Sequence, residues 1–282
     1  MIPFDFAYYK PVTKQEAVDL FYELNAEDKQ PMYYAGGTEI ISFARLNSIF
    51  TKAVIDIKAI PECNVLEFDR NSLIIGGAVT LTKIQEVNYF PLLSQAGGRV
   101  ADHTTRGKIT LGGNMLSRLP YREAILPLLA AESEIITLGR DGEKRQKINN
   151  LYQETLQLEP GELLLQVVTE KTSVEAPCLS LKKTSQGDVS YPQNKIGYPL
   201  MSLAALRKES RIRIAISGLC AYPFRSKELE NALNEEESPD NRVQTALGCL
   251  PSGIVEDMEG SASYREYIFK DMLSQVLENL EG

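Results

Sequence analysis

Two glycine pairs constrain this chain most, because each interrupts an apolar run where the backbone must turn. The first pair lies in YAGGTEII, residues 34–41, and the second in TLGGNML, residues 110–116. Glycine has no Cβ, so it can adopt positive φ and lets another group approach the backbone closely. Successive N–H groups in such a turn can converge on an anion such as a phosphate. Two facing turns of this kind could hold a pyrophosphate.

The common nucleotide-binding motifs do not explain these pairs. A Rossmann site needs G-x-G-x-x-G after a strand, with an acidic residue about 20 positions later. Neither pair has this spacing, and the chain contains no G-x-x-x-x-G-K-[ST] segment. A nucleophilic triad is also poorly supported, because His103 is the only histidine and no G-x-S-x-G segment accompanies it. A glycine pair alone is weak evidence for a ligand, since Gly76-Gly77 and Gly97-Gly98 also occur here.

Composition excludes several classes of function. The 282 residues, 43% of them hydrophobic, are enough for more than one domain. No stretch approaches the roughly 20 apolar residues of a membrane helix, and the first residues lack a charged segment followed by an apolar one, so a cytoplasmic location is expected. A net charge of −8 does not favour a nucleic-acid surface. The four cysteines have no C-x-x-C pair, so no metal site built by this chain alone is expected.

The first half of the chain alternates between helix and strand patterns. The segment 13–25 predicts a helix, with Thr13 and Glu16 at capping-box spacing. Short apolar runs that end at turn residues predict strands near 30–35, 53–57, 72–80 and 163–168. This alternation indicates an α/β or α+β domain.

The last hundred residues follow a different pattern. Residues 184–199 are rich in Gly, Pro, Ser and Asn and predict a long loop, while 211–218 alternate as a half-buried strand does. The charged segment 235–242 is interpreted as a solvated loop. Residues 261–280 predict an amphipathic helix that begins at a capping box formed by Ser263 and Glu266.

Five segments together resemble one known family. In chain order they are AGGTE (35–39), IGGAVT (75–80), TTRGKITLGGN (104–114), PGELLLQVVTE (160–170) and ASYREY (262–267). Their order and spacing are similar to those of the FAD-binding medium subunit of the xanthine dehydrogenase and carbon monoxide dehydrogenase family of molybdenum hydroxylases. The resemblance extends over nearly the whole chain, and the length suits a separately encoded flavin subunit.

The resemblance implies an α+β fold with an FAD-binding domain of the vanillyl-alcohol oxidase type, also called PCMH-like. This domain would cover residues 1–172, in subdomains of about 1–57 and 58–172. A smaller C-terminal domain of sheet and helices would cover 177–282. The pyrophosphate of FAD would lie between the two glycine turns.

The resemblance also implies which residues contact FAD. The residues that match the family's two phosphate-binding turns are Ala35, Gly36, Gly37, Thr38 and Glu39 in the first turn and Thr110, Leu111, Gly112, Gly113 and Asn114 in the second. Ser117 stands where the family often has a small polar residue near the phosphates.

Four further positions are expected around the rest of the cofactor. Glu123 stands where the family usually has an aspartate near the ribose or adenine end. Leu164 resembles an apolar residue that packs on the adenine, and Lys182 a lysine near the flavin ring. Arg106 fits the arginine of an "IRN" segment, although its asparagine is replaced by Gly107. The segment LPYRE, 119–123, also departs from the family pattern by losing the aspartate.

By resemblance, this chain is an electron-transfer subunit without catalytic residues of its own. A molybdenum cofactor on a large subunit would oxidise the substrate, with a purine such as xanthine as the first expectation. Electrons would pass through [2Fe–2S] clusters on a small subunit to FAD, and then to NAD+, oxygen or another acceptor. Two alternatives stay open: an assembly subunit that has lost flavin, and a self-sufficient FAD reductase of the same superfold.

Overall fold

The computed structural model describes residues 1–184, 199–251 and 253–281, in two compact units. The first unit consists of Met1–Val87, His103–Ser117 and Ser133–Thr169, and the second of Asn88–Asp102, Arg118–Glu132 and Glu170–Gly282. The second unit thus takes in residues 88–102 and 118–132, which the sequence interpretation assigned to the FAD-binding domain. The division at residues 172–177 stays a prediction.

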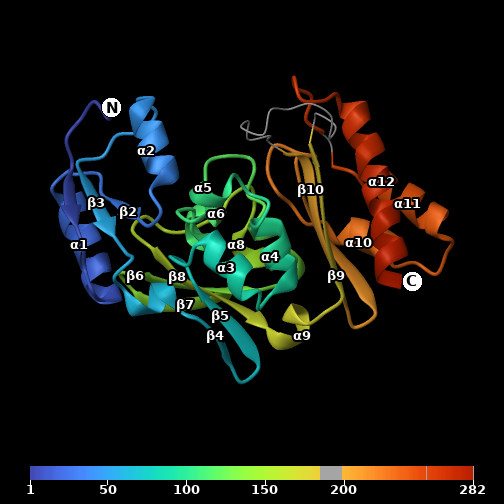
Figure 1. The fold of residues 1–282 in the computed structure, drawn as a ribbon, viewed down its shortest axis with the longest axis horizontal. Coiled ribbons are helices and arrows are strands. Elements are labelled where there is room, and N and C mark those ends of the chain that lie inside the picture. The colour runs from blue at the N-terminus through green and yellow to red at the C-terminus, as the bar shows by residue number, and fades with distance from the viewer. Residues whose placement is uncertain (185–198, 252, 282) are drawn as a thin grey trace. The chain divides into compact units, whose positions relative to one another are not determined.

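A small parallel sheet begins the first unit, in the order β1 (Ala7–Tyr9), β3 (Ala53–Asp56), β2 (Met32–Tyr34). Helix α1 (Lys14–Ala26) precedes β2, and helix α2 (Thr38–Arg45) follows it (Figure 1). The Thr13 side chain accepts a hydrogen bond from the Glu16 N–H, so the predicted cap of α1 is confirmed.

A five-stranded sheet forms the rest of the first unit. Its order is β4 (Leu66–Asp69), β5 (Ser72–Gly76), β8 (Leu163–Glu170), β6 (Glu134–Gly139), β7 (Gly142–Lys147). The shorter elements of this unit are η1 (Pro61–Asn64), α3 (Leu81–Val87), α5 (His103–Arg106), α6 (Leu111–Met115) and α8 (Ile148–Leu151). One buried core joins the two sheets, because Ile55 of β3 and Leu163 and Leu165 of β8 belong to the same cluster.

The second unit is built on an antiparallel sheet in which β10 (Pro199–Lys208) lies between β9 (Cys178–Thr184) and β11 (Arg211–Ser217). Helix α12 (Ala262–Glu281) packs on β10 and β9, and α7 (Ile125–Ala130) packs on β10 and β11. The other helices of this unit are α4 (Pro91–Gly97), α9 (Lys171–Val174), α10 (Lys227–Leu233) and α11 (Pro239–Gly248) (Figure 1).

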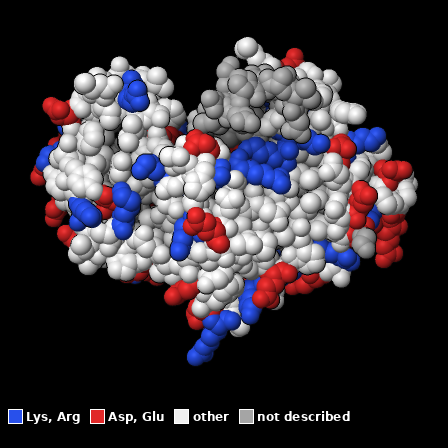
Figure 2. Space-filling view, in the orientation of Figure 1, with Lys and Arg blue, Asp and Glu red and all other residues white. Residues whose placement is uncertain are grey.

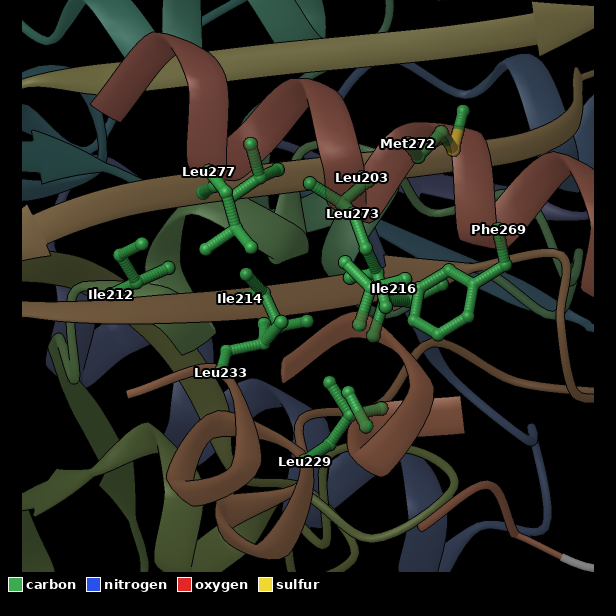
Figure 3. Close-up of a cluster of buried hydrophobic side chains, with 14 of the residues drawn as sticks. Leu203, Ile212, Ile214, Ile216, Leu229, Leu233, Phe269, Met272, Leu273 and Leu277 are labelled. Atoms are coloured by element: carbon green, nitrogen blue, oxygen red, sulfur yellow. The ribbon is translucent and has the colours of Figure 1, made fainter. Parts of the chain in front are cut away.

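The core of the second unit forms where α12 and α10 meet the sheet. Leu203 of β10, Ile214 of β11 and Phe269 and Leu273 of α12 belong to one buried cluster, in which Ile216 lies beside Phe269 (Figure 3). The buried residues of this cluster alternate along β11 and recur at helical spacing along α12, as a strand face packed under a helix requires. The strand predicted over 211–218 and the helix predicted over 261–280 are therefore confirmed.

Three local expectations differ from the structure. The hydroxyl of Ser261, not that of Ser263, accepts the hydrogen bond from the Tyr264 N–H, so the last helix begins two residues earlier. Part of the predicted loop 235–242 is helical, because Ser238 caps α11 and Pro239 occupies its first turn. Strand β10 was not predicted. Most of the predicted loop 184–199 lies outside the described residues.

We expect Phe269→Ala to destabilise the second unit by about 3–5 kcal/mol, because it leaves a cavity in a core where Phe269 is fully buried. Tyr267→Ala, on the exposed face of the same helix and 68% accessible, should change stability by less than about 0.5 kcal/mol. Urea unfolding followed by circular dichroism measures both. Equal midpoints for the two variants would contradict the packing described for α12.

Candidate functional site

The first glycine turn connects β2 with α2 and leaves no room for side chains. Gly37 has φ 70° and is the N-cap of α2, and a Cβ there would lie 2.2 Å from the Tyr34 hydroxyl. A Cβ on Gly36 would lie 1.8 Å from the backbone oxygen of Lys108. Both positions therefore require glycine, one for its conformation and one for close backbone packing.

This turn presents backbone donors that have no acceptor within the described part of the chain. They are the N–H groups of Gly36, Gly37, Thr38 and Ile40. The first N–H groups of any helix lack intrahelical acceptors, and the partial positive charge of the helix N-terminus adds to them. The segment can therefore accept an anion without breaking an existing hydrogen bond.

The second glycine turn differs from the expectation of an equivalent anion-binding turn. The Leu111 N–H donates to Val79 O at 2.9 Å, and the Gly112 N–H donates to Gly77 O at 2.9 Å. The Gly113 N–H donates to the Thr110 side chain at 3.1 Å, and the Asn114 N–H to the Thr110 backbone oxygen. These N–H groups already donate to acceptors inside the protein. The second turn therefore offers no free backbone donors at Leu111, Gly112, Gly113 or Asn114.

A third glycine pair, Gly76-Gly77, packs between the second turn and strand β8. The Gly77 N–H donates to Leu165 O at 2.8 Å, and a Cβ on Gly77 would lie 2.7 Å from Leu164 O. A Cβ on Gly112 would in turn lie 2.9 Å from Gly77 O. The backbones of β8, Gly77 and Gly112 are thus in direct contact. The sequence analysis included Gly76-Gly77 in one of the five family-like segments but assigned it no contact with a ligand.

The structure brings the two glycine turns together within the first unit. Gly36 packs on Lys108, two residues before the second turn. Ser117, which follows that turn, donates a hydrogen bond from its hydroxyl to the Glu39 carboxylate at the start of α2. The two predicted turns therefore lie close together, and their binding of a pyrophosphate stays a prediction.

The first unit also contains Arg106 and Leu164. Arg106 ends the short helix α5 and is half-buried, whereas the nearby His103 is exposed. Leu164 lies in β8 with 3% of its surface exposed, and its neighbours Leu163 and Leu165 belong to the core between the sheets. The predicted contacts of Arg106 and Leu164 with a cofactor stay predictions.

Glu123 and Lys182 belong to the second unit and contact each other. The Lys182 Nζ lies 3.1 Å from Glu123 Oε1 and donates to Arg99 O at 2.6 Å. Only 4% of the Glu123 side chain and 14% of the Lys182 side chain are exposed. Burial raises the pKa of Glu123 above its ordinary value, although the positive charge of Lys182 opposes this shift. The two predicted positions thus form a buried ion pair.

Sequence reasoning missed a polar group at the end of β3. The Asp56 carboxylate accepts hydrogen bonds from the hydroxyl of Tyr8 and from Nζ of Lys58, and Lys58 also donates to Ala35 O in the first glycine turn. The sequence did contain a signal for this group, since an aspartate ends the apolar run AVID. The strands β1, β3 and β2 are parallel, so their carboxyl ends meet at one edge of the sheet, where such a residue lies near its neighbours.

Other site classes find no support in the part of the chain that the structure describes. No group of three or more His, Cys, Asp or Glu residues could hold a metal ion there, and no described helix is long and apolar enough to cross a membrane. Figure 2 shows acidic and basic side chains interspersed on the visible face of the first unit.

Comparisons with known proteins show the family to which the chain is similar. Residues 4–169 match the family model described as the FAD binding domain in molybdopterin dehydrogenase. The chain is 24% identical to the carbon monoxide dehydrogenase medium chain of Hydrogenophaga pseudoflava, over 98% of this chain and 97% of that protein. It is 19% identical to the nicotinate dehydrogenase FAD-subunit of Eubacterium barkeri, over 99% of this chain and 98% of that protein.

Solved structures have the same fold along the whole chain. Carbon monoxide dehydrogenase from Hydrogenophaga pseudoflava matches with a TM-score of 0.85 and 22% identity, over 99% of this chain and 98% of that chain. Quinoline 2-oxidoreductase from Pseudomonas putida 86 matches with a TM-score of 0.83 and 18% identity, over 100% of this chain and 99% of that chain.

We expect Lys182→Met to cost about 3–5 kcal/mol of stability, because it leaves the buried Glu123 carboxylate without its cation. The double variant Glu123→Gln/Lys182→Met should regain most of this loss. Because the pKa of Glu123 is raised in the folded protein, the single variant should approach wild type as the pH falls through that pKa and Glu123 becomes neutral. Urea unfolding at pH 7 and pH 5 tests this.

The matched control is Lys183→Met, because Lys183 is 40% exposed and its carboxylate partner Asp271 is 48% exposed. It should unfold like wild type at both pH values, as exposed pairs contribute little. If Lys182→Met behaved in the same way, the buried pair would have no energetic role.

Proposed function

Because this chain belongs to the family of FAD-binding domains of molybdopterin dehydrogenases, we propose that it is the flavin-binding, electron-transfer subunit of a molybdenum hydroxylase complex. Its fold is the mixed α+β, PCMH-like fold predicted from the sequence, as the matched structures confirm. The observation that carries the proposal is the first glycine turn, where four N–H groups without acceptors in the described residues lie at the start of a helix.

The residues present fit FAD. Its pyrophosphate is an anion, and the N–H groups of Gly36, Gly37 and Thr38 are donors at a helix N-terminus. A Cβ on Gly36 would collide with Lys108 O and one on Gly37 with Tyr34, so only glycine permits the conformation that presents these donors. We propose that the first turn binds the phosphates through hydrogen bonds, and that residues 110–114 form the opposite wall. Ser117 then acts indirectly, by holding Glu39.

Around the rest of the cofactor we keep the predicted roles as proposals. Leu164 would pack on the adenine, and Arg106 would lie beside the second turn. Glu123 and Lys182 would act as one ion pair near the flavin, not as two independent contacts. A paired Lys182 brings little net charge to its surroundings, because the Glu123 carboxylate offsets it.

When bound, FAD supplies the capacity to accept a pair of electrons from one partner and release them to another. The residues of this chain bind and orient it, and we propose none of them as an acid, base or nucleophile. This division is typical of cofactor enzymes, in which the protein provides binding, orientation and electrostatics.

The names of the relatives support a complex of several subunits, because they include a medium chain, an FAD-subunit, and the subunit alpha of a 6-hydroxypseudooxynicotine dehydrogenase complex. We propose a molybdopterin-binding large subunit and a [2Fe–2S] small subunit, with NAD+ or another acceptor. The relatives are named for carbon monoxide, nicotinate and caffeine, so xanthine is only one possible substrate. The cytoplasmic location also stays a prediction.

The proposal is tested by the absorbance spectrum of the chain, purified alone and as a complex with its neighbouring gene products, and by mass analysis of the released cofactor. FAD in either sample supports flavin binding by this fold. Flavin in neither sample would leave an assembly subunit. Turnover of a substrate by the chain alone would instead indicate a self-sufficient reductase.

We expect Gly36→Ala to remove FAD from the purified protein, because its Cβ would overlap the Lys108 oxygen and displace the turn. Gly248→Ala is the matched control, since nothing lies within 4 Å of a Cβ at that position. Absorbance of bound flavin measures the loss, and circular dichroism checks that both variants fold. Retention of FAD by a folded Gly36→Ala variant would contradict the assignment of this turn.

A further inference from the structure

Lys58 is held beside the first glycine turn by contacts with Ala35, Asp56 and Tyr34. Its Nζ donates to Ala35 O at 2.9 Å and to Asp56 Oδ2 at 2.8 Å, and lies 4.6 Å from the centroid of the Tyr34 ring. Its backbone N–H donates to Asp56 Oδ1 at 2.9 Å. A lysine side chain normally has several accessible rotamers, so this set of contacts selects one of them.

Asp56 holds this lysine in place. Its side chain is 2% exposed, and the hydroxyl of Tyr8 donates to the same carboxylate oxygen as the Lys58 ammonium. Burial alone would raise the pKa of Asp56, but the hydrogen bonds from Lys58 and Tyr8 hold it below its ordinary value. A buried carboxylate that stays charged needs a cation nearby, which ties Lys58 to the end of β3.

The contact with Ala35 acts directly on a donor of the turn. Ala35 O and the Gly36 N–H belong to one planar trans peptide group, so they point in opposite directions. Lys58 fixes the oxygen and thereby directs the Gly36 N–H away from itself. Accepting a charge-assisted hydrogen bond also polarises the peptide group, which strengthens the N–H as a donor. The Gly36 N–H has no acceptor within the described residues.

We propose that Lys58, held by Asp56, is a positioning residue for the pyrophosphate of the dinucleotide: it orients and polarises the Ala35–Gly36 peptide so that Gly36 donates to a phosphate oxygen. This inference rests on the proposed function. The Lys58 side chain is 45% exposed, so its positive charge also reaches the solvent next to the turn. The chain has a net charge of −8, and a fixed cation at this point favours an anionic ligand locally.

The test compares Lys58→Met, Lys58→Arg and Lys52→Met in the complete chain, purified with its partner subunits and stripped of flavin. Lys52 is a matched control, because it is 48% exposed and pairs with the exposed Asp28 away from the glycine turn. FAD affinity is measured by quenching of flavin fluorescence. Inorganic pyrophosphate then competes with FAD, which reports on the phosphate subsite alone.

We expect Lys58→Met to weaken FAD and pyrophosphate each by about tenfold or more, since a hydrogen bond to a charged group contributes on that scale. Lys58→Arg retains the cation and should bind within about threefold of wild type. Lys52→Met should bind like wild type. The thermal unfolding midpoint of each variant shows that it is folded.

The outcomes separate the inference from the function on which it rests. If the wild-type complex takes up no FAD, the proposed function fails, and the inference with it. If wild type binds FAD and Lys58→Met binds FAD and pyrophosphate equally well, only the role of Lys58 is overturned. If Lys58→Arg loses FAD as fully as Lys58→Met, the residue fixes local structure and the positive charge has no part in binding.

Discussion

Direct contact between backbones at glycine is the constraint on which the candidate site depends. Gly36 packs on the Lys108 carbonyl, and Gly112 packs on Gly77, which itself packs on the Leu164 carbonyl in β8. A Cβ at any of these three positions would lie closer than 3.0 Å to a backbone atom. A packed backbone cannot give way as the end of a flexible side chain can. The sheet, the second turn and the first turn are therefore held at separations that only glycine permits. Local packing, more than local flexibility, explains the glycine pairs.

The two glycine turns look alike in sequence but perform different physical tasks. The second turn uses its N–H groups to bind Val79, Gly77 and Thr110, so its hydrogen bonds hold the protein together. The first turn is held by contacts that leave its N–H groups without acceptors in the described residues: glycine packing and the lysine bound to Ala35 O. A binding site needs both kinds of turn. Backbone donors can be left open for a ligand only where other interactions fix the backbone.

Local patterns predicted much of the fold. The cap at Thr13, the strands around 32–34, 53–56 and 72–76, and the last helix follow from periodicity and capping, which depend on near neighbours in the chain. Strand β10 escaped prediction because almost all of it is buried, so its residues do not alternate. The resemblance of five segments to one family identified the fold and the cofactor class, which no single segment could do.

The site was only partly predictable, because some of its contacts join residues that are far apart in the sequence. Motifs identify which residues gather at the turns, but not which N–H groups already have acceptors, because Val79 O and Gly77 O reach the second turn only through the fold. Likewise, Glu123 and Lys182 are 59 positions apart, and only the structure shows that each is the other's counter-ion.

An acidic chain can bind an anionic cofactor only through local fields, because charges beyond roughly 8 Å are largely screened at physiological salt. The structure concentrates suitable groups within that range of the first turn: the helix N-terminus of α2, its N–H donors and the ammonium of Lys58. Asp56 reduces the net charge there but keeps the ammonium in one place. A cation that is already fixed by a buried partner requires less rearrangement when the ligand binds than a mobile one does. This fixed orientation compensates for part of the positive charge that Asp56 neutralises.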